Sequence, residues 1–429
     1  MRILYVIHQF YPEASSGTER FLLGLAMSVR RMGHHADVVT YSFSAKSQFR
    51  RVGELLVREY TYKGISVTAL RHKKIPIDIN TSVGDPAIFR FASQFLDKGG
   101  YDVVHIAHPM RLTSFIPAAV ELRIPYVLTL TDFWIFCPKI NLQTSFGTLC
   151  CGPAAGKACA ELCPELAKPF VKERLKAASQ ILQASEAVIV PSQFAMSMVQ
   201  KEFAQLAITV ISHGLKLTPF KSNRRTHDAE SRIVFAYCGG LSPHKGVHTL
   251  LNAFRSLKTE TAELRLYGAA SSKDKDYEQI LRRIAGGDHR IKFCGEYNEE
   301  DLGQVLESID VLVIPSLVYE TYSFTLHEAF AANVPVIASP IGVLAEKVID
   351  SVTGLTFRVG DEAELASKLM LVLENPSIVQ KMKENLSNQF PPLQEEEAYL
   401  YERIYQNSSN KKHIARPPSR WERLTEPAE

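Results

Sequence analysis

Short apolar runs alternate with amphipathic stretches along most of the chain. The first run, 2–7, is followed by a polar loop, an amphipathic stretch over 19–32 and a second apolar run at 36–41. Short apolar runs between turn residues are typical of buried strands, and apolar residues at every third or fourth position are typical of helices. The pattern predicts a strand–helix–strand unit whose loop lies at the carboxyl end of the first strand.

The same alternation starts afresh after a polar, turn-rich segment at 212–232. Further strands are predicted at 102–106, 126–131 and 187–190 before this segment, and at 233–237, 264–267, 291–293, 311–314 and 336–338 after it. Strands that alternate with helices favour parallel sheets with helices on both faces. We therefore expect an α/β protein with two doubly wound domains, joined by the turn-rich segment.

Domain boundaries follow from this alternation. We expect an N-terminal domain over 1–214, a C-terminal domain over 215–391 and a last helix over 392–406 that packs back on the N-terminal domain. Residues 407–429 are polar and contain a proline pair, so we expect a flexible tail there.

Length and composition are those of ordinary globular domains. The chain has 429 residues, of which 46% are hydrophobic and 22% are charged, which is enough for two cores. No apolar run approaches the roughly 20 residues that a membrane-spanning helix needs. The first apolar run is too short for a signal peptide, so we expect a cytoplasmic protein.

Positive charge is concentrated in the first half of the chain. Residues 1–220 carry 24 Lys and Arg against 16 Asp and Glu, a net charge of +8, whereas the rest carries 25 against 30, a net charge of −5. A basic half would be attracted to the inner face of an anionic membrane, at on the order of 1 kcal/mol per surface cation. Scattered, solvated charges explain the excess equally well. Because no basic stripe with interleaved aromatic residues accompanies it, we expect no nucleic-acid partner.

Five of the seven cysteines lie in one segment, 137–164, which is rich in glycine and proline. In a reducing compartment such a cluster is more typical of a metal site than of disulfides. Four thiolates complete the tetrahedral coordination of zinc. One interpretation is a structural zinc held by Cys137, Cys150, Cys159 and Cys163, with Cys151 spare. Reduced thiols or a disulfide are the alternatives. The segment as a whole is predicted to be a lid-like excursion stapled by its thiols.

Two carboxylates flank a predicted helix N-terminus in the C-terminal domain. Glu320 lies on the loop after strand 311–314, and Glu328 lies about one turn into the helix that begins near Phe324, which we expect the Ser323 side chain to cap. The backbone amides of residues 321–323 stand between them, where a helix N-terminus favours an anion. Ligands of open α/β sheets bind at this edge. The spacing suits a nucleotide-sugar, with hydroxyls at both ends and phosphate in the middle, although chance also places glutamates this far apart.

The first loop of the C-terminal domain, CGGLSPHK, offers Gly239 and Gly240 for a close backbone approach and Lys245 for a diphosphate. It does not fit the P-loop pattern, so a P-loop ATPase is disfavoured. In the N-terminal domain, SSGTER around Gly17 is placed as a phosphate or sugar cradle. Asp132 follows a predicted strand and is either a polar group of the binding site or a helix cap.

These motifs together resemble the GT-B glycosyltransferases, specifically glycosyltransferase family four. The resemblance rests on GGLSPHKG, on the two glutamates with seven residues between them, on PSLVYE…EAFAANVPVIAS and on SSGTERFLLGLAMSVRRMGH, and it covers roughly residues 1–390. The segment TLTDFWIFCP with its later cysteines is similar to a branch of the family with a cysteine-containing insertion. The resemblance implies two Rossmann-like domains that face each other across a cleft.

The resemblance also implies an activity. It implies a retaining hexosyltransferase that moves a sugar from a nucleotide-sugar to a glycan, lipid-linked or other cytoplasmic acceptor, as in polysaccharide biosynthesis. Glu320 would contact hydroxyls of the donor sugar, Glu328 the nucleotide ribose and Lys245 the diphosphate. The family needs no catalytic metal, because Lys and Arg stabilise the departing diphosphate in its place.

The remaining residues implied by the resemblance belong to the same donor. The diphosphate would be bound by the backbone amides of Thr321, Tyr322 and Ser323, and Gly17 would let the N-terminal loop approach it. The catalytic candidates are Glu320, Lys245, Asp132 and His108.

Two positions depart from the family pattern. Family members commonly have Arg where this chain has Gly240, and many have His where it has Thr131. His108 or Asp132 would then serve the donor sugar. Losing a cation aimed at developing charge raises a barrier by a few kcal/mol. A second interpretation is therefore a catalytically weak or inactive scaffold that binds nucleotide-sugars or glycans. An epimerase of the same fold is a third, disfavoured by the paired glutamates and the cysteine insertion.

Overall fold

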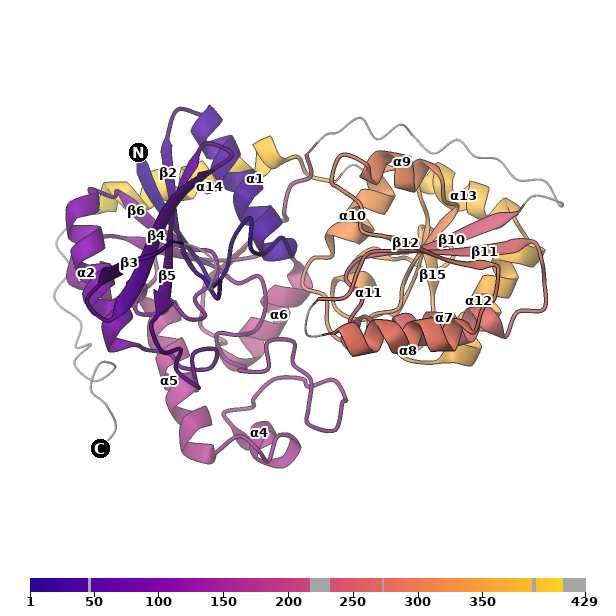
Figure 1. Ribbon diagram of the computed structural model, residues 1–429, viewed down its shortest axis with the longest axis horizontal. Helices are drawn as coiled ribbons and strands as arrows, with labels where there is room; N and C mark the ends of the chain where they lie inside the picture. The colour runs from indigo at the N-terminus through magenta and orange to yellow at the C-terminus, as the bar shows by residue number, and fades with distance from the viewer. Residues whose placement is uncertain (45–47, 217–231, 272–273, 388–390, 412–429) are drawn as a thin grey trace. The chain divides into compact units, whose positions relative to one another are not determined.

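The computed structural model describes residues 1–44, 48–216, 232–271, 274–387 and 391–411. The chain divides into two compact units, one formed by Met1–Gly214 with the segment from Leu393 onward, and one formed by Leu215–Pro392 (Figure 1). Most of the predicted linker, 217–231, and the last part of the predicted tail, 412–429, lie outside the described residues.

The N-terminal unit is built on a nine-stranded sheet in the order β3-β4-β5-β2-β1-β6-β7-β8-β9. The strands are β1 (Arg2–Ile7), β2 (His35–Tyr41), β3 (Arg50–Val52), β4 (Leu55–Tyr62), β5 (Ile65–His72), β6 (Val103–Ile106), β7 (Tyr126–Thr129), β8 (Ala187–Val190) and β9 (Ile208–Val210). All pairs are parallel except β3 with β4 and β4 with β5. Strand order reverses between β1 and β6, so their carboxyl ends form a topological switch point.

Helices cover the faces of this sheet. They are α1 (Gly17–Arg31), α2 (Pro86–Gly99), α3 (Phe115–Glu121), α4 (Lys157–Leu162), α5 (Lys168–Ala184), α6 (Gln193–Glu202) and α14 (Gln394–Lys411). The start of α2 follows from local chemistry: Asp85 accepts a hydrogen bond from the Ile88 N–H, and Pro86 occupies the first turn. Only α4, a single short helix, forms within the cysteine-rich segment, and none of its residues is buried.

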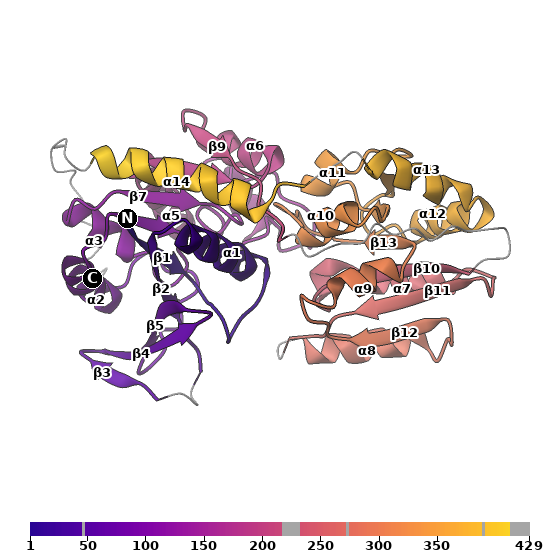
Figure 2. The same cartoon turned by 90° about the horizontal axis from the view of Figure 1, so that it is seen from above.

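The last helix, α14, belongs to the N-terminal unit, where it lies beside α1 and over β6 and β7 (Figure 2). Its Glu397 accepts a hydrogen bond from the Gly214 N–H at 2.9 Å and lies 3.0 Å from Nδ1 of His213. The prediction that a flexible tail begins at 407 is wrong for 407–411, which continue the helix. The helix packs against the unit beyond 407, because Ser408 is buried.

The C-terminal unit has a six-stranded sheet in the order β12-β11-β10-β13-β14-β15, and all of its pairs are parallel. The strands are β10 (Ile233–Cys238), β11 (Ala262–Tyr267), β12 (Ile291–Gly295), β13 (Val311–Ile314), β14 (Val336–Ala338) and β15 (Gly354–Thr356). Strand order reverses between β10 and β13. The loops that follow these two strands, which carry Lys245 and Glu320, therefore lie at the switch point.

Helices pack on both faces of the second sheet and build a hydrophobic core on each. They are η1 (Pro243–Lys245, a 3₁₀ turn), α7 (Val247–Arg255), α8 (Lys275–Ala285), α9 (Leu302–Glu307), α10 (Phe324–Ala331), α11 (Val343–Lys347), α12 (Glu362–Glu374) and α13 (Ser377–Leu386). Burial on both faces explains why the central strands are almost continuously apolar. The predicted α/β class with doubly wound parallel sheets is confirmed.

Candidate functional site

Lys245 and Glu320 form an ion pair at the switch point of the C-terminal unit. Nζ of Lys245 lies 2.7 Å from Oε1 of Glu320, and the Ser316 hydroxyl donates to the same oxygen at 2.7 Å. Burial alone would raise the pKa of the Glu320 carboxyl, but the charge and hydrogen bond of Lys245 outweigh burial and hold that pKa below its usual value. Glu320 is therefore ionised at neutral pH.

Glycine lets the two loops of this pair approach each other closely. Gly246 has φ +69°, and a Cβ there would stand 2.0 Å from the Pro315 carbonyl oxygen. The Leu317 N–H donates to the His244 carbonyl at 2.9 Å, which joins the loops directly. Gly342 is equally constrained, because a Cβ there would stand 2.4 Å from the Glu320 carbonyl oxygen. The position of Glu320 is thus fixed by backbone contacts on both sides.

The predicted anion-binding amides lie directly after Glu320, at the start of α10. Ser323 occupies the N-cap position at φ +63°, but its side chain makes no capping hydrogen bond. The expectation that the Ser323 hydroxyl caps this helix is therefore wrong, because the left-handed backbone turns the residue out of capping geometry. The ring of the buried Tyr322 stacks on His327, with centroids 4.1 Å apart. Glu328 is buried in the same helix.

Gly239 and Gly240, on the loop that carries Lys245, differ in how closely they are packed. Gly239 has φ +150°, and its carbonyl oxygen would be 1.9 Å from a Cβ on Gly268. Gly240 accepts a hydrogen bond from the Tyr237 hydroxyl at 2.7 Å, and a Cβ there would meet nothing within 4 Å. The loop is therefore tightly packed at Gly239 and open at Gly240.

Asp132 and His108 form a second pair, at the switch point of the N-terminal unit. Nε2 of His108 lies 2.8 Å from Oδ2 of Asp132, and Nδ1 of His108 accepts from the Met110 N–H at 3.3 Å. His108 therefore carries its proton on Nε2 and donates it to Asp132. The other oxygen of Asp132 accepts from the Trp134 N–H at 2.8 Å. Asp132 thus holds a local turn and faces a histidine, and its side chain stays 26% exposed for a ligand.

Sequence reasoning missed two residues that adjoin this pair, His8 and Glu19. The His8 ring packs against His108 at an interplanar angle of 42°, with centroids 4.0 Å apart, and its Nε2 lies 3.7 Å from Oε1 of the fully buried Glu19. Burial lowers the pKa of His8 and raises that of Glu19. A signal for Glu19 was present, because a serine three residues before a glutamate is a capping box, and the Ser16 N–H donates to Glu19 at 2.7 Å.

Gly17 begins α1 at the same edge of the N-terminal unit. The neighbouring Thr18 hydroxyl donates to the Thr131 hydroxyl at 3.0 Å, which ties the start of α1 to the end of β7. Each unit thus brings its own predicted residues together: Gly17, His108 and Asp132 in one, and the residues around Lys245 and Glu320 in the other.

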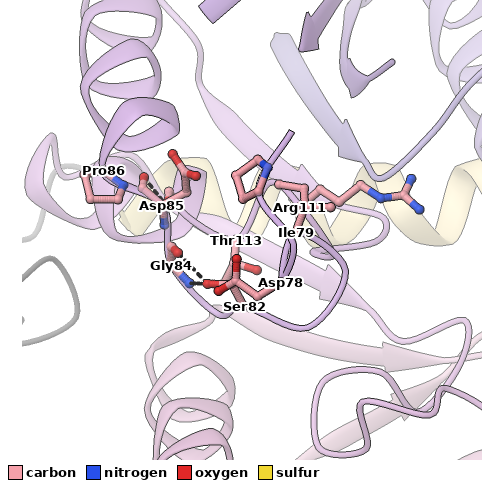
Figure 3. Close-up of a pocket in the computed structure, with 10 residues that line it drawn as sticks. Asp78, Ile79, Ser82, Gly84, Asp85, Pro86, Arg111 and Thr113 are labelled. Atoms are coloured by element: carbon pink, nitrogen blue, oxygen red, sulfur yellow. Dashed lines mark hydrogen bonds between the residues drawn. The ribbon is translucent and has the colours of Figure 1, made fainter. Parts of the chain in front are cut away.

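A cavity of about 210 Å³ lies in the N-terminal unit (Figure 3). None of the residues that line it was predicted to be a site residue. Its lining residues are Pro76, Asp78, Ile79, Ser82, Gly84, Asp85, Pro86, Arg111, Thr113 and Ser114. In Figure 3 the guanidinium of Arg111 points away from Asp85, in keeping with its bond to the His8 carbonyl at 2.8 Å. The volume is below the roughly 300 Å³ at which ligand pockets begin, so a nucleotide-sugar does not fit inside it.

The cysteines of segment 137–164 are free thiols. Cys150 and Cys163 are buried, Cys137 and Cys159 are half-buried and Cys151 is exposed. Burial raises the pKa of Cys137 to about 11 and that of Cys159 to about 12. Within the described ranges, no three His, Cys, Asp or Glu side chains are grouped so that they could hold a metal ion. The zinc interpretation stays a prediction.

The structure contains no long apolar helix of the kind that spans a membrane, as far as the described residues show.

Two doubly wound units of this kind are the architecture of the GT-B glycosyltransferases. The chain belongs to this class by sequence: residues 15–218 match the family described as Glycosyltransferase Family 4, and residues 220–389 match Glycosyl transferases group 1. The resemblance to glycosyltransferase family four is thereby confirmed, whereas the branch with a cysteine-containing insertion stays a prediction.

Curated relatives of the chain are also named as transferases of sugars. The chain is 28% identical over 182 residues to the lipopolysaccharide 1,2-N-acetylglucosaminetransferase of Salmonella typhimurium. The matched region covers 39% of this chain and 47% of the relative. The match therefore spans about half the length of that enzyme. An uncharacterized glycosyltransferase of Methanocaldococcus jannaschii is 26% identical over 369 residues, which is 83% of this chain and 84% of the relative.

Solved structures share the fold. Anabaena HepE in complex with UDP superimposes with a TM-score of 0.67 over 96% of this chain and 100% of HepE, at 19% identity. HepE has also been solved with UDP-glucose. At this identity the likeness supports the fold.

Proposed function

We propose that the protein is a retaining glycosyltransferase that moves a hexosyl group from a nucleotide-sugar to a glycan or lipid-linked acceptor. One observation carries the proposal: the Lys245–Glu320 pair stands 2.7 Å apart at the switch point, beside the start of α10. Lys245 is the cation for the phosphates, and the ionised Glu320, in direct contact with it, is the acceptor for sugar hydroxyls.

Each group around the pair takes one part of the donor. Lys245 stabilises the negative charge that develops on the diphosphate as the bond to the sugar breaks. Glu320 accepts hydrogen bonds from sugar hydroxyls, and Ser316 keeps its carboxylate oriented. The N–H groups at the start of α10 receive the diphosphate. Glu328, farther along the helix, is assigned to the ribose hydroxyls.

In the N-terminal unit we assign sugar binding to Asp132. His108 donates to one of its oxygens and so fixes the direction of the carboxylate, which leaves its exposed side for a sugar hydroxyl. His108 has both ring nitrogens engaged and acts as a positioning residue. A retaining outcome and an activity without a catalytic metal are proposed on the family resemblance.

A donor screen tests the proposal. Calorimetry with UDP-glucose, UDP-N-acetylglucosamine, GDP-mannose and ADP-glucose is expected to find a uridine nucleotide-sugar among the binders, because HepE binds UDP-glucose and the Salmonella relative is named for N-acetylglucosamine. Slow release of free sugar from the bound donor is expected in the same samples. Binding of no donor would contradict the proposal. Binding without any turnover on glycan and lipid-linked acceptors would favour the scaffold interpretation, which Gly240 and Thr131 motivate.

The loop after β5 exposes two lysines and one isoleucine, which supports peripheral contact with an anionic membrane. Lys73 and Lys74 are exposed directly after β5, and the side chain of Ile77 is fully exposed, with a relative accessibility of 105%. Two surface lysines contribute about 2 kcal/mol to binding an anionic surface. An aliphatic side chain on the same loop adds apolar area for the bilayer.

Liposome sedimentation tests this contact. We expect the Lys73→Ala/Lys74→Ala variant to bind vesicles with phosphatidylserine about 30-fold more weakly at low salt. The Lys172→Ala/Lys176→Ala variant, which removes two exposed lysines of α5, is the matched control. Binding that salt does not weaken, or an equal loss in both variants, would contradict the proposed contact.

A further inference from the structure

The charge at the switch point of the C-terminal unit does not balance a nucleotide-sugar, which brings two negative charges on its diphosphate. Lys245 is already paired with Glu320, so the pair contributes no net charge. Gly240, which lies on the same loop, has no side chain, although a Cβ there would meet nothing within 4 Å. There is room for a side chain at position 240, so lack of space does not explain why this chain has glycine where family members commonly have arginine.

His244 stands next to this pair on the same 3₁₀ turn. Its carbonyl accepts from the Leu317 N–H at 2.9 Å, which fixes the turn against the loop that carries Glu320. Its Nε2 lies 3.3 Å from the Ser242 hydroxyl, and its ring is half-buried. The backbone of His244 is thus fixed against the loop that carries Glu320, and the Ser242 hydroxyl contacts its ring, at the site where the diphosphate is proposed to bind.

We propose that His244 takes up a proton when the donor binds and supplies the second positive charge at the diphosphate. This inference rests on the proposed function. The charged groups that face the ring are Lys245 on its own turn, Glu320 on the neighbouring loop and Asp274 at the start of α8. Arrival of the diphosphate adds two negative charges to this set and favours the charged ring.

The direction of the proton linkage follows from the unliganded state. Burial and then the charge of Lys245 lower the pKa of His244 below its ordinary value of 6.5, so the ring is neutral in the free protein at pH 7. A bound diphosphate raises the pKa of the ring in the complex. Between the two pKa values each donor binds together with a proton. Affinity is therefore highest below the free-protein pKa and falls, by up to roughly tenfold per pH unit, until pH passes the pKa of the complex.

Calorimetry in two buffers with different ionisation enthalpies measures this proton directly. UDP-glucose is the first probe, because both of its phosphates are diesters that do not titrate between about pH 5 and pH 8, where histidine does. GDP-mannose or ADP-glucose replaces it if that donor is the one that binds. We expect wild-type protein to take up a fraction of one proton per donor at neutral pH.

Three variants separate charge from packing. His244→Gln keeps the size and hydrogen-bonding capacity of the ring but cannot charge, so we expect no proton uptake and the weak affinity of high pH throughout. His244→Lys carries a permanent charge, and we expect it to keep the low-pH affinity over the whole range. His289→Gln removes an exposed histidine of the same unit and is expected to behave as wild type.

The outcomes distinguish this inference from the proposed function. If wild type binds a nucleotide-sugar without proton uptake, or if His244→Gln takes up as many protons as wild type, the role of His244 is overturned while the proposed function stands. If His244→Lys binds as weakly as His244→Gln, a charge at this position is not what the donor needs, and the inference fails. If no nucleotide-sugar binds to wild type at any pH, the proposed function fails and takes this inference with it.

Discussion

Replacing Glu320 by glutamine is expected to lower kcat/KM by at least about a hundredfold, the range measured when one preorganised polar group is removed from an active site. Glutamine has the same shape and can keep a hydrogen bond to Ser316, but it removes the negative charge. Lys245 then loses its ion-pair partner at 2.7 Å, and the strong acceptor for sugar hydroxyls is gone. Steady-state kinetics with the donor found in the screen measures the change.

The matched control is Glu374→Gln, which removes an exposed carboxylate at the end of α12 and is expected to keep wild-type kinetics. Unchanged turnover in Glu320→Gln would remove Glu320 from the mechanism. Loss in both variants would point to a general effect of charge on the unit rather than to a role at the site.

The same substitution is expected to reduce stability in a pH-dependent way. The folded-state pKa of Glu320 lies below the ordinary value of 4.5, so its ionisation stabilises the folded state above that value, and this contribution is lost as pH falls through the folded pKa. A hydrogen bond to a charged group contributes about 2 kcal/mol. Thermal unfolding at neutral pH should therefore separate wild type from Glu320→Gln, and the two should converge in acid.

Parallel strands and their loops were predictable from the sequence because burial on both faces makes such strands read as plain apolar runs. This holds for β10 and β13, whose following loops carry Lys245 and Glu320. The strands β3 to β5 were missed for the opposite reason. They pair antiparallel near the sheet edge, and in β4, LLVREYTY, Leu55 and Val57 alone are buried, so that its polar positions hide the strand.

Contacts created by topology were beyond the reach of the sequence pattern. The rings of His8 and His108 are in contact because β1 and β6 are neighbours in the sheet, although 100 residues separate them. Pairing order is not encoded in the periodicity of either strand. The left-handed conformation of Ser323 was missed as well, because serine at that position predicts an ordinary cap. Sequence therefore places residues on loops, and the pairing of strands decides which loops meet.

Replacing Gly246 by alanine is expected to damage the site strongly. The residue has φ +69°, which costs about 1–2 kcal/mol for a residue with a side chain, and the new Cβ would stand 2.0 Å from the Pro315 carbonyl oxygen. Relieving such a clash adds about 1–3 kcal/mol. We expect a loss of about 2–5 kcal/mol in the free energy of unfolding, measured by urea denaturation.

The loss of activity is expected to exceed the loss of folded protein, because relief of the clash must separate the two loops at the switch point. Separation lengthens the bond from the Leu317 N–H to the His244 carbonyl and moves Lys245 away from Glu320. A displacement of about 1 Å of a catalytic group can lower a rate about a hundredfold. The control is Gly303→Ala on α9, where a Cβ meets nothing within 4 Å, so that alanine is expected to be neutral or slightly stabilising. Equal stability and turnover in the two variants would mean that the close approach of the loops does not hold the Lys245–Glu320 pair in place.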